Sequence, residues 1–244
     1  MPRKARSFQG NTVYHVMNRA AARAEIFRKE ADYAAFERTL EEAHARIPLR
    51  ILSYVIMPNH FHLVLWPARG DGQNLSEFMR WLQVTHVQRW HAHYHSSGTG
   101  ALYQGRFKAF PVQGGFAHFQ YPGKVCRYVE RNPLRAGLVR EAQAWRWGSL
   151  WRRLSGTPEQ RALLAAWPEG SYPGDQAWAE RVNRTQGAAE EKALQACIKR
   201  GRPFGDPAWL SKSAATMDLG HTLRPRGRPK KAEKVKQKHP QPRR

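Results

Sequence analysis

Acidic residues, cysteine and long apolar runs are all scarce in this sequence. Its 244 residues include only 19 Asp and Glu against 41 Lys and Arg, which gives a formal net charge of +22. The two cysteines, Cys126 and Cys197, lie far apart, which excludes a disulfide scaffold. No apolar run approaches the roughly 18 residues that a membrane span needs, and the first residues contain no apolar signal core. We therefore expect a cytoplasmic protein.

The excess of positive charge indicates a polyanionic partner. Ten Lys or Arg and one acidic residue fall between Thr222 and Arg244, so this segment carries +9 and the rest of the chain +13. Because such charge repels itself unless a polyanion neutralises it, we expect nucleic acid as the partner and a nucleoid-associated location. Hydrophobic residues make up 41% of the chain, enough to bury a core, which excludes disorder throughout.

Composition divides the chain into three parts. Residues 1–153 alternate between strand-like and helix-like segments and are predicted to form one compact domain. Residues 154–223 hold short helical pieces among recurring Gly and Pro, including Ala188–Arg200, and are predicted to form a helical appendage. Residues 224–244 consist mainly of Arg, Lys, Pro and Gln and are predicted to form a basic, disordered tail.

The alternation along the first part predicts an α+β fold. Its two apolar runs, Leu49–Ile56 and His60–Trp66, are separated only by Met57-Pro58-Asn59, which suits a tight connection between antiparallel strands. Asn74 and Glu77 have the spacing of a capping box at the start of a helix. The predicted strands are 13–18, 49–56, 60–66 and 101–112, and the predicted helices are 31–47, one starting near 74, and 122–131. An antiparallel sheet with helices on one face is the expected arrangement.

His60 and His62 form the first candidate site. Side chains alternate along a strand, so these two imidazoles share one face and can converge on one cation. The alternative is a pair of histidines on a solvated or hydrogen-bonded face, and eleven histidines in the chain make a chance pair common.

Tyr128 and Asn132 form the second candidate site. Their i, i+4 spacing places them one above the other on a single helix face. Pro133 then ends the helix and leaves the Asn132 amide free in the last turn. Taken alone, a helix tyrosine is usually packing and an Asn before Pro is ordinary turn chemistry.

Four motifs contain or follow these residues in chain order: MPNHFHLVLW at 57–66, YQGRFKAFPV at 103–112, YVERNPLRAGLV at 128–139 and WRWGSLWRR at 145–153. In this combination the chain closely resembles the REP-associated tyrosine transposases (RAYTs), a group of single-tyrosine HUH transposases. The similarity runs from about Phe8 to Lys231 and includes YHVMNR near the start and RGRPFGDPAW near the end.

The resemblance implies a ferredoxin-like core and cleavage and rejoining of single-stranded DNA at REP-type hairpins. His60 and His62 match the HUH histidines, Tyr128 matches the nucleophile, and Asn132 matches the third metal ligand that follows it. The implied cofactor is Mg²⁺ or Mn²⁺, which polarises the scissile phosphate. Attack by the tyrosine would give a covalent 5′-phosphotyrosine. Because a tyrosine has an ordinary pKa of about 10, the metal, Arg131 or Arg135 is expected to favour the phenolate.

Basic and polar side chains supply the candidates for DNA binding. Alternation along YQGRFKAF predicts that Arg106 and Lys108 contact phosphates and that Gln104 reaches a base edge, although a solvated strand face fits equally well. Pro225-Arg226-Gly227-Arg228-Pro229 resembles an AT-hook core, whose arginines enter a narrow minor groove. The full set of candidates is Arg19, Gln104, Arg106, Lys108, Arg131, Arg135, Arg226 and Arg228.

Other functions remain open from the sequence. Pro122-Gly123 falls where the tyrosine helix should begin, so a decayed copy that acts as a non-catalytic DNA-binding regulator is the main alternative. A metal-dependent hydrolytic nuclease is the third. Tyr121 is the weaker nucleophile because nothing like Asn132 follows it at the same spacing. The resemblance favours a monomer, with a dimer as the alternative.

Overall fold

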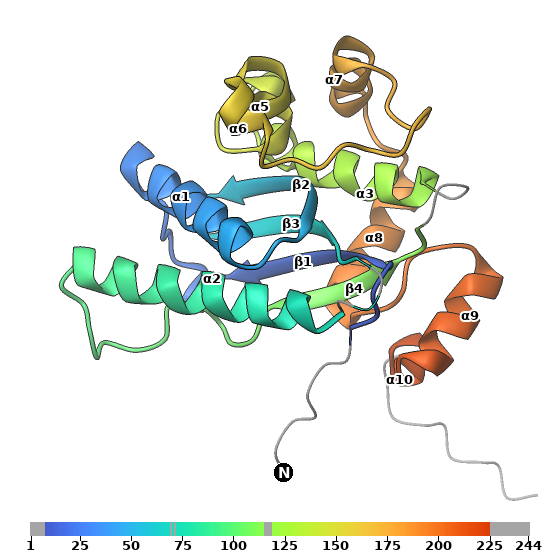
Figure 1. Cartoon of the computed structure of the whole chain (residues 1–244), viewed down its shortest axis with the longest axis horizontal. Helices are drawn as coiled ribbons and strands as arrows, with labels where there is room; N and C mark the ends of the chain where they lie inside the picture. The colour runs from blue at the N-terminus through green and yellow to red at the C-terminus, as the bar shows by residue number, and fades with distance from the viewer. Residues whose placement is uncertain (1–7, 69, 71, 115–118, 225–244) are drawn as a thin grey trace, which may run out of the picture.

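A four-stranded antiparallel sheet forms the centre of the protein (Figure 1). The structure is a computed structural model that describes residues 8–68, 70, 72–114 and 119–224. The strands are β1 (Val13–Arg19), β2 (Arg50–Met57), β3 (His60–Trp66) and β4 (Lys108–Val112), in the spatial order β2-β3-β1-β4. The tight connection predicted between residues 56 and 60 is confirmed, because β2 and β3 pair from Met57↔His60 onward.

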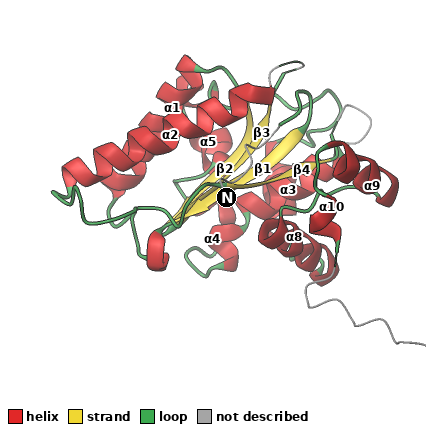
Figure 2. Cartoon of the chain, turned by 90° about the horizontal axis from the view of Figure 1, so that it is seen from below, coloured by secondary structure: helices red, strands yellow, loops and turns green. Residues whose placement is uncertain are grey.

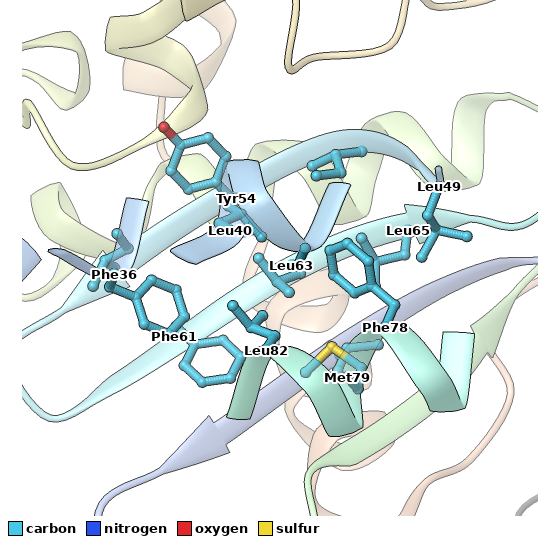
Figure 3. Close-up of a cluster of buried hydrophobic side chains, with 14 of the residues drawn as sticks. Phe36, Leu40, Leu49, Tyr54, Phe61, Leu63, Leu65, Phe78, Met79 and Leu82 are labelled. Carbon is cyan, nitrogen blue, oxygen red and sulfur yellow. The ribbon is translucent and has the colours of Figure 1, made fainter. Parts of the chain in front are cut away.

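One face of the sheet packs against α1 (Glu30–Arg46) and α2 (Gly72–His93). Alternate strand side chains such as Phe61 and Leu63 point into this layer, where they meet Phe36 of α1 and Phe78 of α2 (Figure 3). All four of these side chains are fully buried. Burial of a side chain of this size contributes roughly 1.5–3 kcal/mol, so this layer anchors both helices to the sheet.

The opposite face of the sheet is also covered. It packs against α3 (Gln120–Glu130), α5 (Ser149–Ser155) and α8 (Ala188–Arg200), and α7 (Asp175–Asn183) packs in turn against α3 and α5. Figure 2 shows α3 and α8 on the far side of the sheet from α1 and α2. The α+β class and the antiparallel sheet are confirmed, but helices lie on both faces rather than on one. The reason is that β2 and β3 are buried at nearly every position, so each face needs a cover.

The remaining elements are short or lie in the appendage. They are η1 (Ala21–Arg23), α4 (Asn132–Arg135), η3 (Ala142–Ala144), α6 (Pro158–Arg161), α9 (Pro207–Thr216) and α10 (Gly220–Leu223). The helix predicted at Ala188–Arg200 is confirmed as α8. Among the described residues, no helix is both long enough and apolar enough to cross a membrane.

Three local predictions differ from the structure. Helix α2 begins at Gly72, so Asn74 lies inside its first turn instead of capping it. The strand predicted over 101–112 is ordered as a strand only from Lys108, because Gly105 adopts a positive φ of 142° and leaves Tyr103 in an isolated bridge with Ala20. Helix α3 begins at Gln120, which places Pro122 in its first turn, where proline is tolerated.

Candidate active site

The face of the sheet that packs against α3 carries both candidate histidines. His60 and His62 lie on β3 with ring centroids 5.0 Å apart. Tyr128 reaches them from α3, and its ring centroid is 6.3 Å from that of His62. Strand β1 lies beside them, with Arg19 directly opposite His60 in the antiparallel register. The two histidines and Tyr128, which the family resemblance places side by side, therefore form a spatial cluster.

The hydrogen bonds of His60 fix which ring nitrogen is available. Its Nδ1 lies 2.6 Å from Oδ1 of Asn59, and the Asn59 amide nitrogen donates to the carbonyl oxygen of Arg23. An amide oxygen can only accept, so Nδ1 of His60 carries the proton and donates. The Nε2 lone pair of His60 is thereby left for a metal ion.

His62 has a partner that the sequence analysis missed. Its Nδ1 lies 2.8 Å from Nε2 of His15, and both side chains are almost fully buried. His15 is on β1 at a position of the same parity as Val13, so it faces α3 like the two β3 histidines. A polar residue at an inward position of an apolar strand was the available signal.

Burial keeps the imidazoles in the neutral form that binds metals. It lowers the pKa of His60 to about 3, with a smaller contribution from the nearby positive charges of Arg19 and Arg135. Burial also lowers the pKa of His62 well below its ordinary value, and His60 and His15 add to the effect. Both imidazoles are therefore uncharged at neutral pH, as a metal ligand must be.

Tyr128 is buried beside a cation. Its side chain is only 5% exposed, and the guanidinium carbon of Arg135 lies 4.7 Å from its ring centroid. Burial raises the pKa of Tyr128, while Arg135 and, more weakly, Arg19 act to lower it. Of the two arginines expected to favour the phenolate, Arg135 lies against the Tyr128 ring, whereas the Arg131 guanidinium donates to the carbonyl oxygen of Val182 at the end of α7.

The Asn132 side chain is hydrogen-bonded through both its nitrogen and its oxygen, in contrast to the free amide predicted. Its Nδ2 donates to the backbone oxygen of Tyr128 at 2.9 Å, and its Oδ1 accepts from Arg135 at 2.6 Å. The chain continues through α4 after Pro133, so Asn132 is held inside a helical turn. Arg135 also pairs with Glu191 of α8 at 2.7 Å, which links the appendage to the site. The Asn132 oxygen accepts one hydrogen bond and keeps a second lone pair that a metal could use, beside the Arg135 guanidinium.

Among the described residues, no group of three or more His, Cys, Asp and Glu side chains is placed to hold a metal ion. The candidate donor set is instead two imidazoles and an amide. The two Nε2 atoms suit a divalent transition metal and leave coordination positions open for phosphate oxygens. The donor chemistry therefore fits a loosely held cation.

Apart from Arg131 and Arg135, the DNA-binding candidates lie in three parts of the chain. Arg19 borders the site, and its Nε is buried without a hydrogen-bond partner in the described part of the chain. Gln104 and Arg106 are exposed on the segment that leads into β4, and Lys108, the first residue of β4, is exposed too. The backbone N–H of Gln104 donates to the carbonyl oxygen of Arg19. This segment therefore starts next to the site. Arg226 and Arg228 lie outside the described residues.

Comparison with solved structures identifies the class of the fold. A structure described as a REP-associated tyrosine transposase bound to a REP hairpin aligns with a TM-score of 0.50 and 18% identity, over 70% of this chain and 94% of the other. A transposase-like protein from Deinococcus radiodurans R1 aligns with a TM-score of 0.36 and 16% identity, over 53% and 96%. The fold predicted from the resemblance is thus that of a solved tyrosine transposase.

Sequence comparison identifies the family. The family model described as "Transposase IS200 like" matches residues 9–132, which is half of the chain and spans β1 through the start of α4. This chain belongs to the IS200-like transposase family. No curated protein matches the sequence.

Proposed function

We propose that this protein is a metal-dependent transposase that cleaves and rejoins single-stranded DNA at REP-type hairpins through a covalent 5′-phosphotyrosine on Tyr128. The observation that carries the proposal is the meeting of Tyr128 with His60 and His62 on one face of the sheet. Family membership supports transposase activity in general.

Tyr128 supplies the nucleophile. Its phenol oxygen attacks the scissile phosphorus, the new Tyr O–P bond forms, and the P–O3′ bond breaks. The phenol gives up its proton, and the departing 3′ oxygen takes one to become a free 3′-OH. A phosphodiester replaces a phosphodiester, so a 3′-OH can reverse the step and rejoin DNA without another energy source.

His60, His62 and Asn132 would hold the Mg²⁺ or Mn²⁺ ion, each through one side-chain atom. When bound, the ion polarises the scissile phosphate and offsets the charge that develops during attack. Arg135 makes two contacts in this arrangement. Its charge favours the phenolate of Tyr128, and it donates to the Asn132 oxygen, which keeps a second lone pair for the ion.

Single-stranded hairpin DNA is the proposed substrate. The similar solved structure is described as bound to a REP hairpin. Much of the positive charge of this chain lies outside the tail. Arg19 borders the reacting groups, which suits contact with the scissile phosphate. Arg106 is exposed just before β4, and Lys108 is exposed at its first residue. The tail arginines Arg226 and Arg228 would add contacts to the flanking duplex.

Trapping of a covalent intermediate tests the proposal. Hairpin oligonucleotides from the genomic neighbourhood of the gene are incubated with the full chain and Mn²⁺ or Mg²⁺, then analysed under denaturing conditions. We expect a protein–DNA adduct that requires metal and is lost in Tyr128→Phe. The matched control is Tyr121→Phe, because Tyr121 lies on the same helix but packs against Phe204.

Two outcomes would contradict the proposal in different ways. Tight hairpin binding with no adduct under either metal would indicate the non-catalytic regulator. Metal-dependent cleavage with no protein-linked product, unchanged in Tyr128→Phe, would indicate a hydrolytic nuclease.

A further inference from the structure

His15 is a buried polar side chain that the proposed reaction does not use. Its relative exposure is 1%, and it lies on β1 among apolar residues. A buried polar group is costly unless it is hydrogen-bonded. Within the described part of the chain, His15 hydrogen-bonds to Nδ1 of His62 at 2.8 Å, and its ring stacks on Phe110 with centroids 4.8 Å apart.

The direction of this hydrogen bond decides whether His62 can bind a metal. If Nδ1 of His62 donates to Nε2 of His15, the Nε2 lone pair of His62 is free. If Nε2 of His15 donates instead, a neutral His62 carries its proton on Nε2 and has no lone pair there. Only the first arrangement gives a ligand on the side of His62 away from His15.

We propose that His15 is a positioning residue that accepts the Nδ1 proton of His62 and so fixes the tautomer and ring orientation in which Nε2 of His62 binds the metal. This inference rests on the metal site of the proposed function. Stacking on Phe110 holds the His15 ring. The Asn59 oxygen accepts the Nδ1 proton of His60 in the same way that His15 would accept that of His62. Partners of this kind usually change metal affinity by about 10–100-fold when removed.

A purely structural role for His15 needs a matched comparison, and His86 provides one. His86 is 3% exposed and hydrogen-bonds to the hydroxyl of Tyr103 at 2.7 Å. It packs against Phe27 and Phe36 in the layer on the opposite face of the sheet, away from the metal ligands. Its replacement therefore removes a buried, hydrogen-bonded imidazole without touching the site.

The experiment measures Mn²⁺ binding to the full chain without DNA, by electron paramagnetic resonance of the free ion. His15→Phe keeps an aromatic ring on Phe110 but removes the acceptor, while His15→Gln keeps an acceptor oxygen. We expect Mn²⁺ affinity to fall about 10–100-fold in His15→Phe, to fall less in His15→Gln, and to stay at the wild-type value in His86→Phe.

Several results would overturn the inference. Wild-type affinity in His15→Phe would show that His62 needs no partner, and an equal loss in His86→Phe would show that the effect is general destabilisation. If circular dichroism shows that His15→Phe does not fold, the test uses His15→Gln. A Mn²⁺ affinity of His15→Gln as low as that of a chain lacking His62 would contradict the acceptor role. Absence of Mn²⁺ binding in the wild type would remove the metal site itself, and the adduct assay above would register that failure separately.

Discussion

Replacement of Arg135 by glutamine should raise the pKa of Tyr128. The Arg135 guanidinium carbon lies 4.7 Å from the Tyr128 ring centroid, and its charge opposes the effect of burial on that phenol. Arg135→Gln removes the charge but keeps a donor for the Asn132 oxygen. An opposite charge at 4–6 Å typically shifts a pKa by about 1–3 units. Because the Arg135 side chain is 35% exposed and also pairs with Glu191, we expect the lower end, about one unit, or about 1.4 kcal/mol.

The measurement is direct titration of the residue. With 3-fluorotyrosine incorporated at position 128, the ¹⁹F chemical shift follows the phenol through its ionisation in the metal-free full chain. Arg131→Gln is the matched control, since Arg131 is one turn away and donates to backbone oxygens of α7. In Arg131→Gln we expect the titration midpoint of residue 128 to match that of the wild type.

A structural role for Arg135 alone would give a different result. If Arg135 merely held the end of the helix, Arg135→Gln would lower thermal stability and leave the midpoint of Tyr128 where it was. An unchanged midpoint in a folded Arg135→Gln protein would refute the electrostatic argument. Some group other than Arg135 would then have to favour the phenolate of Tyr128.

Two further predictions concern acid stability and the tail. Burial lowers the pKa values of His15, His60 and His86 from 6.5 to about 3, so below pH 6.5 the unfolded chain binds protons that the folded chain does not. The free energy of unfolding should therefore be at its full value above pH 6.5 and fall as the pH is lowered, by up to about 1.4 kcal/mol per pH unit for each histidine. Urea titrations at several pH values on the wild type and on His86→Phe would show a shallower fall in the variant. Arg226→Ala with Arg228→Ala should weaken binding to AT-rich duplex and reduce the slope of log affinity against log salt by about two, and an unchanged slope would exclude phosphate or groove contacts by these arginines.

The sequence predicted the elements that carry an uninterrupted local pattern. Spacing of apolar residues predicted α1 to within a residue at each end, and the break at Met57-Pro58-Asn59 predicted the β2–β3 hairpin. The length of β4 and the start of α2 were wrong, because each depends on glycine conformation or on contacts that spacing does not encode.

Within the site, the sequence identified the groups on β3 and α3 but not the groups that support them. His60, His62 and Tyr128 belong to motifs, whereas His15 and Glu191 became relevant only once β1 and α8 were placed beside those motifs. Asn132 shows the same limit, because its hydrogen bond to Arg135 depends on the chain continuing helically past Pro133.

The appendage is packed into the core rather than attached beside it. Trp178 of α7 is fully buried, and its Nε1 donates at 2.6 Å to Glu130, two residues after Tyr128. The same carboxylate accepts from Ser149 at 2.5 Å, and burial raises its pKa. The end of the tyrosine helix is therefore held by residues that follow it in the chain, and the Glu191–Arg135 pair adds a second connection from α8.

This arrangement makes a quantitative prediction about Trp178. Trp178→Ala removes a fully buried indole and leaves the Glu130 carboxylate short of a donor, so the free energy of unfolding should fall by at least about 3–5 kcal/mol. Trp209→Ala is the matched control, because Trp209 is only partly buried on α9. Urea unfolding gives the stability, and adduct formation under conditions where both variants remain folded shows whether Tyr128 is still in place. We expect Trp178→Ala to lose more of both than Trp209→Ala. Equal losses of stability and of adduct formation in the two variants would mean that Trp178 does not hold the helix that carries Tyr128.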